Sequence, residues 1–280
     1  MNTENSIFDT AVIISVYRGD SLSQLQECMD SIFSQSFKNY HIYVQKDGVV
    51  SSDVGEYLDN LKSRGFIHYL GSRQQNRGLA FSLNELLELV LDAKYLYIAR
   101  MDADDICCSN RLEMQRSFLF NNEEIHVCGG EIEEFNEDSK ERVVVSYKAC
   151  HSDILKELRV RNPVAHVTVM IRRSFFEKVG LYNSERLNED LDLWIRGFKC
   201  GAKFHNLDEV LVKVRTSNAF YTRRANWRRA LEVMKLKLHA TKTFKFGASG
   251  YFFAVAHFFL FMSPGWLKIF LYKRLRGNRA

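Results

Sequence analysis

Three carboxylates lie close together after the apolar segment Tyr95–Ala99: Asp102, Asp104 and Asp105 fall within four residues. Crowding like charges at one point costs free energy unless a cation compensates them. Mg²⁺ and Mn²⁺ prefer oxygen ligands and are often held by one or two carboxylates together with a substrate diphosphate. The Asp102-x-Asp104 spacing therefore predicts a metal and diphosphate site. The alternative is an Asp-rich surface turn that precedes a helix near Asn110.

Two further loops carry residues suited to binding a nucleotide. Loop 46–48 (KDG) follows the apolar segment Tyr40–Val44, and loop 76–78 (NRG) follows Ile67–Leu70. An aspartate can accept hydrogen bonds from a base or ribose, and a glycine lets the backbone approach a ligand closely. Each loop by itself is more often a plain turn than a binding site. Together with the carboxylates they predict a crevice that includes Asp47, Asn76, Gly78, Asp102 and Asp104.

The elements that must position these loops alternate between strand and helix. Apolar runs typical of buried strands alternate with segments whose apolar residues recur at helical spacing: strands 11–17, 40–44, 67–70 and 95–99, and helices 22–33, 54–61 and 79–90. This alternation predicts an α/β fold with a Rossmann-like, mostly parallel sheet flanked by helices. Ligands of such sheets bind beyond the carboxyl ends of the strands, where the loops converge.

The pattern changes after residue 125. There we expect a mixed second half with strands 127–135, 143–147 and 167–171 and short helices 154–160 and 175–179. Farther on, the run Leu187–Trp194 places Glu189, Asp190 and Asp192 at the start of a short helix. The helix dipole favours acidic side chains at that position, which is their simplest explanation. Because the sequence shows no Pro-, Gly- or Ser-rich linker, we predict that residues 1–215 form one domain.

Length and composition indicate a folded, globular protein. The 280 residues include 46% apolar residues and only 2 Pro, which excludes disordered and collagen-like classes. The six cysteines are dispersed without a C-x-x-C pair, which predicts free thiols in a reducing compartment. The N-terminal segment MNTENSIFDT lacks the basic start and the apolar stretch of a signal peptide. We therefore expect a cytoplasmic protein.

Charge is concentrated at the C-terminal end of the chain. Residues 213–280 hold 15 Lys and Arg but one acidic residue, Glu232, although the whole chain has a net charge of only +5. Within this segment Trp227, Leu231, Met234 and Leu238 recur at helical spacing among basic residues, as in a basic amphipathic helix. An ordinary helix packed on the core is the alternative for this segment alone.

An aromatic, apolar stretch follows that helix. Tyr251–Met262 is almost wholly apolar, residues 263–265 (SPG) interrupt it, and Trp266–Tyr272 resumes it. Neither piece reaches the roughly 20 residues of a bilayer span, so an interfacial arrangement is favoured over one tilted span through 251–272. We predict that residues 216–280 form a basic, helical tail that associates with an anionic membrane surface. Nucleic acid is not expected, because the aromatic residues are not interleaved singly with basic ones.

In their order along the chain, these motifs resemble the family 2 glycosyltransferases of the GT-A fold. The resemblance covers residues 11–215 and rests on VIISVYRGD, KDG, NRGLAFSLN, MDADD, NPVAHVTVMIRRSFFEKVGLY and NEDLDLW. It implies an enzyme that moves a sugar from a nucleotide-diphosphate sugar to an acceptor hydroxyl with inversion at the anomeric carbon. Mn²⁺ or Mg²⁺ would neutralise the departing diphosphate, and a carboxylate would act as general base.

The resemblance also implies roles for individual residues. By position Asp47 would hydrogen-bond a uracil, Asp102 would lie near the ribose, Asp104 would bind the metal, and Asp190 would be the catalytic base. Further candidates are Glu189 as a support for Asp190, Asp105 as a second metal contact or helix cap, and His166 near the acceptor. One departure is Lys46, which stands where many relatives have an acidic residue.

Similarity to bacterial surface-polysaccharide enzymes (O-antigen, capsule and exopolysaccharide) predicts a UDP-sugar donor and a saccharide acceptor linked to a lipid diphosphate. The chain lacks the Q-x-x-R-W motif of processive members, which predicts single additions. A peripheral location at the inner face of the plasma membrane follows from the tail. Two alternatives are a sugar nucleotidyltransferase, for which VYRGDSLSQ is a poor glycine-rich loop, and a non-catalytic nucleotide-sugar-binding membrane adaptor, in which Asp104 or Asp190 would be missing.

Overall fold

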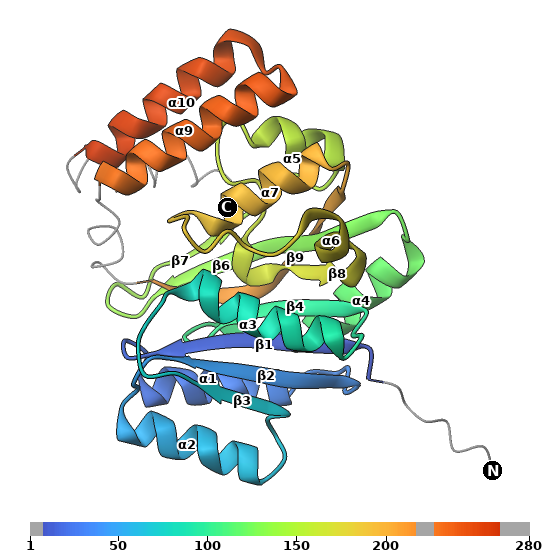
Figure 1. Cartoon of the computed structure of the whole chain (residues 1–280), viewed down its shortest axis with the longest axis vertical. Helices are drawn as coiled ribbons and strands as arrows, with labels where there is room; N and C mark the ends of the chain where they lie inside the picture. The colour runs from blue at the N-terminus through green and yellow to red at the C-terminus, as the bar shows by residue number, and fades with distance from the viewer. Residues whose placement is uncertain (1–7, 217–226, 264–280) are drawn as a thin grey trace.

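The computed structural model describes residues 8–216 and 227–263. Its centre is one nine-stranded sheet with the order β3-β2-β1-β4-β8-β6-β9-β5, and β7 pairs with β6. Helices lie on both faces of the sheet (Figure 1). The predicted α/β fold, with a mostly parallel sheet flanked by helices, is confirmed.

The first half of the chain alternates strand and helix as predicted. Strands β1 to β4 are mutually parallel through the pairs β1–β2, β1–β4 and β2–β3. The elements are β1 (Thr10–Tyr17), α1 (Leu22–Phe33), β2 (Tyr40–Asp47), α2 (Ser52–Ser63), β3 (Tyr69–Ser72), α3 (Leu79–Asp92) and β4 (Tyr97–Asp102). The observed third strand begins two residues later than the expected 67–70. All four strands end at one edge of the sheet, which is where the polar loops follow.

The second half is mixed, because β8 pairs antiparallel with both β4 and β6. Its elements are β5 (Ile106–Cys107), α4 (Arg111–Asn121), β6 (Ile125–Asn136), β7 (Arg142–Val145), α5 (His151–Glu157), η1 (His166–Thr168), β8 (Met170–Arg172), α6 (Arg173–Val179), α7 (Glu189–Lys199) and β9 (Lys203–Thr216). The expected strand 167–171 was wrong in its first half, where the chain forms a short 3₁₀ turn. The long strand β9 was not expected.

The core has two parts, one on each face of the sheet. Ala11 and Ile13 of β1 belong to the part that also contains residues of α3, α7 and α9, whereas Val12, Ile14 and Val16 belong to the part that contains residues of α1, α2 and α4. A parallel strand covered on both faces must be apolar at successive positions. This explains why β1 appears in the sequence as a continuous apolar run. All six cysteines are free, as predicted.

Two helices follow the sheet domain. Helices α9 (Trp227–Phe244) and α10 (Gly247–Met262) lie side by side at one end of the molecule (Figure 1). Helix α9 buries Val233, Leu236 and Ala240 in the core part that also contains α7. None of the helices in the described ranges is long and apolar enough to cross a bilayer. The predicted apolar segment Trp266–Tyr272 lies outside the described residues, and the division into domains 1–215 and 216–280 stays a prediction.

Candidate active site

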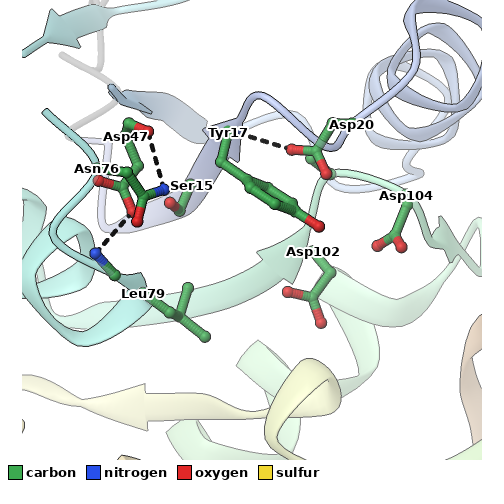
Figure 2. Close-up of a pocket in the computed structure, with 10 residues that line it drawn as sticks. Ser15, Tyr17, Asp20, Asp47, Asn76, Leu79, Asp102 and Asp104 are labelled. Atoms are coloured by element: carbon green, nitrogen blue, oxygen red, sulfur yellow. Dashed lines mark hydrogen bonds between the residues drawn. The ribbon is translucent and has the colours of Figure 1, made fainter. Parts of the chain in front are cut away.

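A pocket of about 400 Å³ opens at the carboxyl ends of the parallel strands. Each of the loops that were predicted to converge contributes to it, from β1, β2, the start of α3, and β4 (Figure 2). Its lining consists of Ser15, Tyr17, Asp20, Asp47, Asn76, Gly78, Leu79, Asp102, Ala103 and Asp104. The five residues predicted for the nucleotide crevice therefore line one cavity.

Three of the lining residues are carboxylates whose charges act on one another. Asp20, Asp102 and Asp104 are drawn around the ring of Tyr17 in Figure 2. Burial, followed by the charges of Asp104 and Asp102, raises the pKa of Asp20 to about 7, although the backbone N–H of Tyr17 donates to its Oδ2 at 2.9 Å. Burial and the charge of Asp102 likewise raise the pKa of Asp104. The pocket therefore concentrates negative charge that the protein compensates only in part.

Asp102 differs from its neighbours because it has a cationic partner. The buried guanidinium of Arg100, two residues earlier on β4, forms an ion pair with both of its carboxylate oxygens. The Asp102 side chain is still 35% exposed, so the ion pair lies at the pocket wall with the carboxylate facing the cavity. Within the described ranges, no three His, Cys, Asp or Glu side chains are grouped closely enough to hold a metal by themselves.

These residues fit a divalent cation that takes part of its coordination from a substrate. The raised pKa values of Asp20 and Asp104 show that a positive charge beside them would be favourable. A cation held by one or two carboxylates and by phosphate oxygens needs no preformed cluster of three side chains. Asp104, with Asp102 or Asp20 beside it, is the group that would hold such an ion.

The acidic loop is anchored from behind by Arg215, near the end of β9. The backbone N–H of Arg215 donates to Asp105 Oδ1 at 2.8 Å, and its Nε donates to the carbonyl oxygen of Asp104 at 3.0 Å. Its guanidinium also pairs with Glu27 and Glu137. Asp105 is only 3% exposed and does not line the pocket, so its contact to Arg215 replaces the second metal contact or helix cap considered for it.

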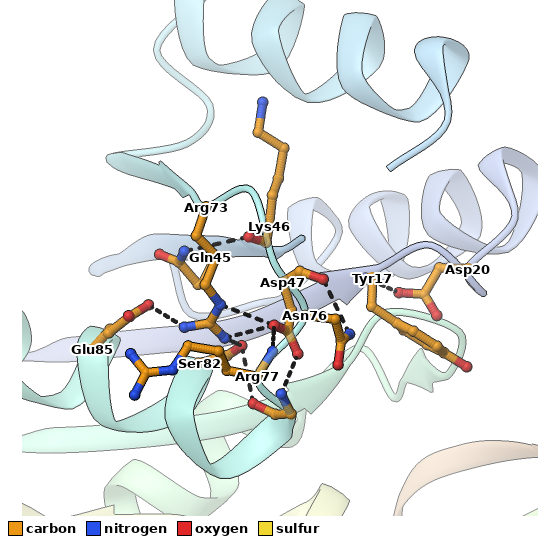
Figure 3. Close-up of polar contacts among 11 residues, drawn as sticks. Tyr17, Asp20, Gln45, Lys46, Asp47, Arg73, Asn76, Arg77, Ser82 and Glu85 are labelled. Carbon is orange, nitrogen blue, oxygen red and sulfur yellow. Dashed lines mark hydrogen bonds and ion pairs between the residues drawn. The ribbon is translucent and has the colours of Figure 1, made fainter. Parts of the chain in front are cut away.

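Asp47 organises the neighbouring loop (Figure 3). Its carboxylate accepts hydrogen bonds from the backbone N–H groups of Arg77 at 2.8 Å and Gly78 at 2.9 Å, and from the side chain of Arg73. The Asn76 side chain in turn donates to the Asp47 carbonyl oxygen at 3.1 Å. Oδ2 accepts one of these bonds, which leaves a lone pair for a ligand. Asp47 thus both lines the pocket and fixes loop 76–78.

Gly48 is required where loops 46–48 and 76–78 touch. Its φ of +85° is a backbone conformation that L side chains rarely adopt, and a Cβ there would lie 2.8 Å from the Asn76 backbone nitrogen. Gly78 has a φ of +96° at the N-cap of α3. Gly48 therefore allows the two loops to lie close together, and Gly78 allows the backbone conformation that starts α3.

Asp190 lies apart from the pocket lining, in the first turn of α7. Its Oδ2 accepts a hydrogen bond from the Asn162 side chain at 2.5 Å, and its Oδ1 accepts one from the Leu191 N–H at 2.7 Å. Burial and the charge of Asp190 raise the pKa of Glu189 to about 7, against opposing effects that include the charges of Arg229 and Arg100. Glu189 is therefore partly protonated at neutral pH.

His166 is enclosed beside the same region. Its Nε2 lies 2.8 Å from the hydroxyl of Tyr182, and its ring meets Trp194 edge to face. Burial and the charge of Arg100 lower the pKa of His166 well below its usual value, so the imidazole is neutral. The Arg100 guanidinium thus forms an ion pair with Asp102, and its charge also lowers the pKa values of His166 and Glu189. His166, Glu189 and Asp190 do not line the pocket.

Sequence reasoning missed several residues of this site: Tyr17, Asp20, Arg73, Arg100 and Arg215. Asp20 had a local signal, since it follows a buried strand by three residues in YRGD, the same position that drew attention to Asp102. Arg100 had one as well, because a cation inside a buried strand beside an Asp run needs a partner. Arg215 had none, since its partners lie 78 to 188 residues away along the chain.

The sheet and its flanking helices have the GT-A fold. The mannosyltransferase PcManGT from Pyrobaculum calidifontis, solved with GDP-Man and Mn²⁺, has the same fold, with a TM-score of 0.62 at 14% identity over 95% of this chain and 80% of that chain. The model of the family described as "Glycosyl transferase family 2" matches residues 11–180. The chain belongs to this family, as its motifs indicated.

Two curated relatives illustrate the family. The amylovoran biosynthesis glycosyltransferase AmsE of Erwinia amylovora is 30% identical over 83% of this chain and 87% of its own length. The UDP-Gal:alpha-D-GlcNAc-diphosphoundecaprenol beta-1,3-galactosyltransferase of Escherichia coli is 27% identical over 82% of each chain. The alignments therefore extend beyond residue 180 into the region that holds α7 and β9.

Proposed function

We propose that the protein is an inverting, metal-dependent, non-processive glycosyltransferase of bacterial surface-polysaccharide biosynthesis. It moves a hexose or N-acetylhexosamine from a UDP-sugar to a saccharide linked to a lipid diphosphate. The observation that carries the proposal is the pocket in which Asp102 and Asp104 face the loops of Asp47 and Gly78. Membership of the transferase family favours this reaction over a sugar nucleotidyltransferase, and the presence of Asp104 and Asp190 favours it over a non-catalytic adaptor.

On the donor side, the uridine would lie against loops 46–48 and 76–78. Asp47 holds loop 76–78 and has a lone pair on Oδ2 that suits the N–H of a uracil. Asp102 would lie beside the ribose, and Asp104 would hold Mn²⁺ or Mg²⁺, which would supply positive charge to the diphosphate. The bound metal would stabilise the charge that grows on the departing diphosphate. The relative from Escherichia coli is named as a UDP-Gal-dependent galactosyltransferase, and PcManGT was solved with Mn²⁺. Both support a UDP-sugar donor and Mn²⁺ for this protein.

On the acceptor side, Asp190 takes the proton of the attacking hydroxyl. The bond between that oxygen and the anomeric carbon forms as the bond to the diphosphate oxygen breaks, so a single displacement inverts the centre. General-base assistance of this kind is typically worth about 10²–10⁴-fold in rate. The hydrogen bond from Asn162 fixes the direction of the Asp190 carboxylate. Glu189 and His166 border the same region as supporting residues.

The exposed face of α10 supports a membrane-bound acceptor. Large apolar side chains that are 43–67% exposed recur along this helix at Tyr251, Phe252, Val255, Phe259 and Met262. Lys235 and Lys242 of α9 are exposed as well, and the described tail is strongly basic. An apolar stripe next to cations is suited to the interface of a bilayer with anionic lipids. We place the enzyme at the inner face of the plasma membrane.

Vesicle flotation tests the membrane surface. Binding to vesicles that contain anionic lipid should fall at least about tenfold in a Phe252→Asp, Phe259→Asp double variant, because two buried aromatic rings are lost from the interface. Phe120→Asp is the matched control, since Phe120 of α4 is 60% exposed but far from α10 in the sequence. Equal flotation of the double variant and the wild type would contradict this part of the proposal.

A donor screen tests the reaction itself. The purified chain is incubated with Mn²⁺, a panel of UDP-, GDP- and dTDP-sugars and a synthetic lipid-diphosphate GlcNAc acceptor, in parallel with Asp190→Asn. Metal-dependent transfer from one UDP-sugar that the variant lacks is the expected result. Absence of both transfer and Mn²⁺-dependent UDP binding would overturn the proposal.

A further inference from the structure

The single acidic residue of the basic tail is used in a contact between α9 and the segment before α7. Glu232 Oε2 accepts a hydrogen bond from the backbone N–H of Leu187 at 3.0 Å, and Oε1 lies 3.5 Å from Arg186 Nη1. The Glu232 side chain is only 14% exposed. Both carboxylate oxygens are therefore directed at residues 186 and 187, three to four positions before Asp190.

A second contact lies one helical turn earlier. Arg229 Nε donates to Asn188 Oδ1 at 3.2 Å. Asn188 is the N-cap of α7, yet its side chain makes no capping hydrogen bond with that helix. An N-cap Asn usually accepts from the second or third N–H of its own helix. Here its oxygen is directed at α9 instead, so the α9 helix fixes the residue that starts α7.

A third contact reaches Asp190 from the other side. Lys237, buried on α9, donates from Nζ to the carbonyl oxygens of Leu158 at 3.3 Å and Arg159 at 3.2 Å. Three residues after Arg159, Asn162 donates to Asp190 Oδ2. Helix α9 thus holds the backbone that precedes Asp190 and also the segment that supplies its hydrogen-bond donor.

We propose that α9 positions the acceptor side of the active site, with Glu232 and Arg229 as positioning residues for Asp190. The nucleotide pocket is lined by residues between 15 and 104, so loosening α9 should slow transfer without weakening donor binding. Helix α9 also packs against α10, and it therefore lies between the exposed apolar stripe and α7 (Figure 1). The inference uses the proposed function only for the role of Asp190.

The test combines amide hydrogen exchange with kinetics on the full chain. Glu232→Ala removes both contacts, whereas Glu232→Gln keeps an acceptor for the Leu187 N–H. His239→Ala, an exposed change on the same helix, is the control. A short-chain, water-soluble lipid-diphosphate acceptor keeps membrane binding out of the assay. Glu232→Ala should raise exchange in peptides covering 186–192 about tenfold and lower kcat about tenfold, with an unchanged KM for the donor. For Glu232→Gln, both the exchange rate and kcat should lie between those of Glu232→Ala and the control.

Two results would overturn the inference. One is unchanged exchange in 186–192 together with a kcat within about twofold of the wild type. The other is a loss of Mn²⁺-dependent UDP binding or faster exchange across β1–β4, since the effect would then be global. Hydrogen exchange does not require turnover. Failure of the wild-type chain to transfer any sugar would therefore refute the proposed function, while the exchange data would still decide whether α9 holds this segment.

Discussion

Replacing Asp20 by Asn should stabilise the metal-free protein, because ionised Asp20 is costly in the pocket. Burial and the neighbouring carboxylates raise the pKa of Asp20 from 3.8 to about 7. This difference corresponds to at most roughly 4 kcal/mol at a pH above both values. The folded state holds its proton between pH 4 and 7 while the unfolded state has lost it, so wild-type stability falls as pH rises through that window. Asn removes the charge and keeps an oxygen for the Tyr17 N–H.

Urea unfolding in EDTA at pH 4, 6 and 8 measures the effect. The free energy of unfolding of Asp20→Asn should exceed that of the wild type by little at pH 4 and by about 1–4 kcal/mol at pH 8. Mn²⁺ with UDP should reduce this difference, because they stabilise the wild type. Asp30→Asn, on the exposed face of α1, is the control and should show no such pH dependence. If the Asp20 variant gained nothing at pH 8, the carboxylates would not be acting on one another as the geometry indicates.

Three further predictions concern the same pocket. Asp104→Asn should lower metal-dependent transfer at least about 100-fold while the melting temperature stays within a few degrees of the wild type, and retention of a tenth of the activity would refute its role. Because the raised pKa values of Asp20, at about 7, and of Asp104 let protons compete with metal, Mn²⁺ affinity measured by calorimetry with UDP should rise from pH 6 to pH 8, and a flat profile would contradict this. Gly48→Ala should reduce the free energy of unfolding by about 2 kcal/mol in urea titrations, since φ is +85° and its Cβ would meet Asn76; an unchanged midpoint would show that the loop can relax.

The first half of the fold was predictable because its information is local. A strand covered on both faces must be apolar at every position, and the helices between such strands show their own spacing, so β1 to β4 were found nearly at their observed bounds. Strand β9 was not, because KFHNLDEVLVKVRT mixes charged and apolar residues without strict alternation. Its strand structure depends on pairing with β6, whose partner residues lie about 80 positions earlier and whose pairing contains register shifts. No local pattern encodes such a pairing.

The residues of the site, too, were predictable only where the information is local. Asp102 and Asp104 were predictable because their chemistry and their place after a buried strand are both visible in one short run. Asp105 belongs to the same run, yet it is directed away from the pocket to the backbone of Arg215. Only the arrival of β9 beside β5 decides between those two directions. The sequence therefore indicated that this run reaches the pocket, but not which of its adjacent carboxylates line it.

The distribution of cations explains how four carboxylates can lie at one edge of the sheet. Asp102 is paired by Arg100, and Asp105 is buried against the backbone and charge of Arg215. Neither of the pKa-raised pocket acids, Asp20 and Asp104, has an ion pair of its own among the contacts of the described ranges, and both line the cavity. The protein thus neutralises the acids that hold the loop and leaves the remaining negative charge facing the pocket. A bound cation and its diphosphate would remove that charge, which links the stability of the loop to occupation of the site.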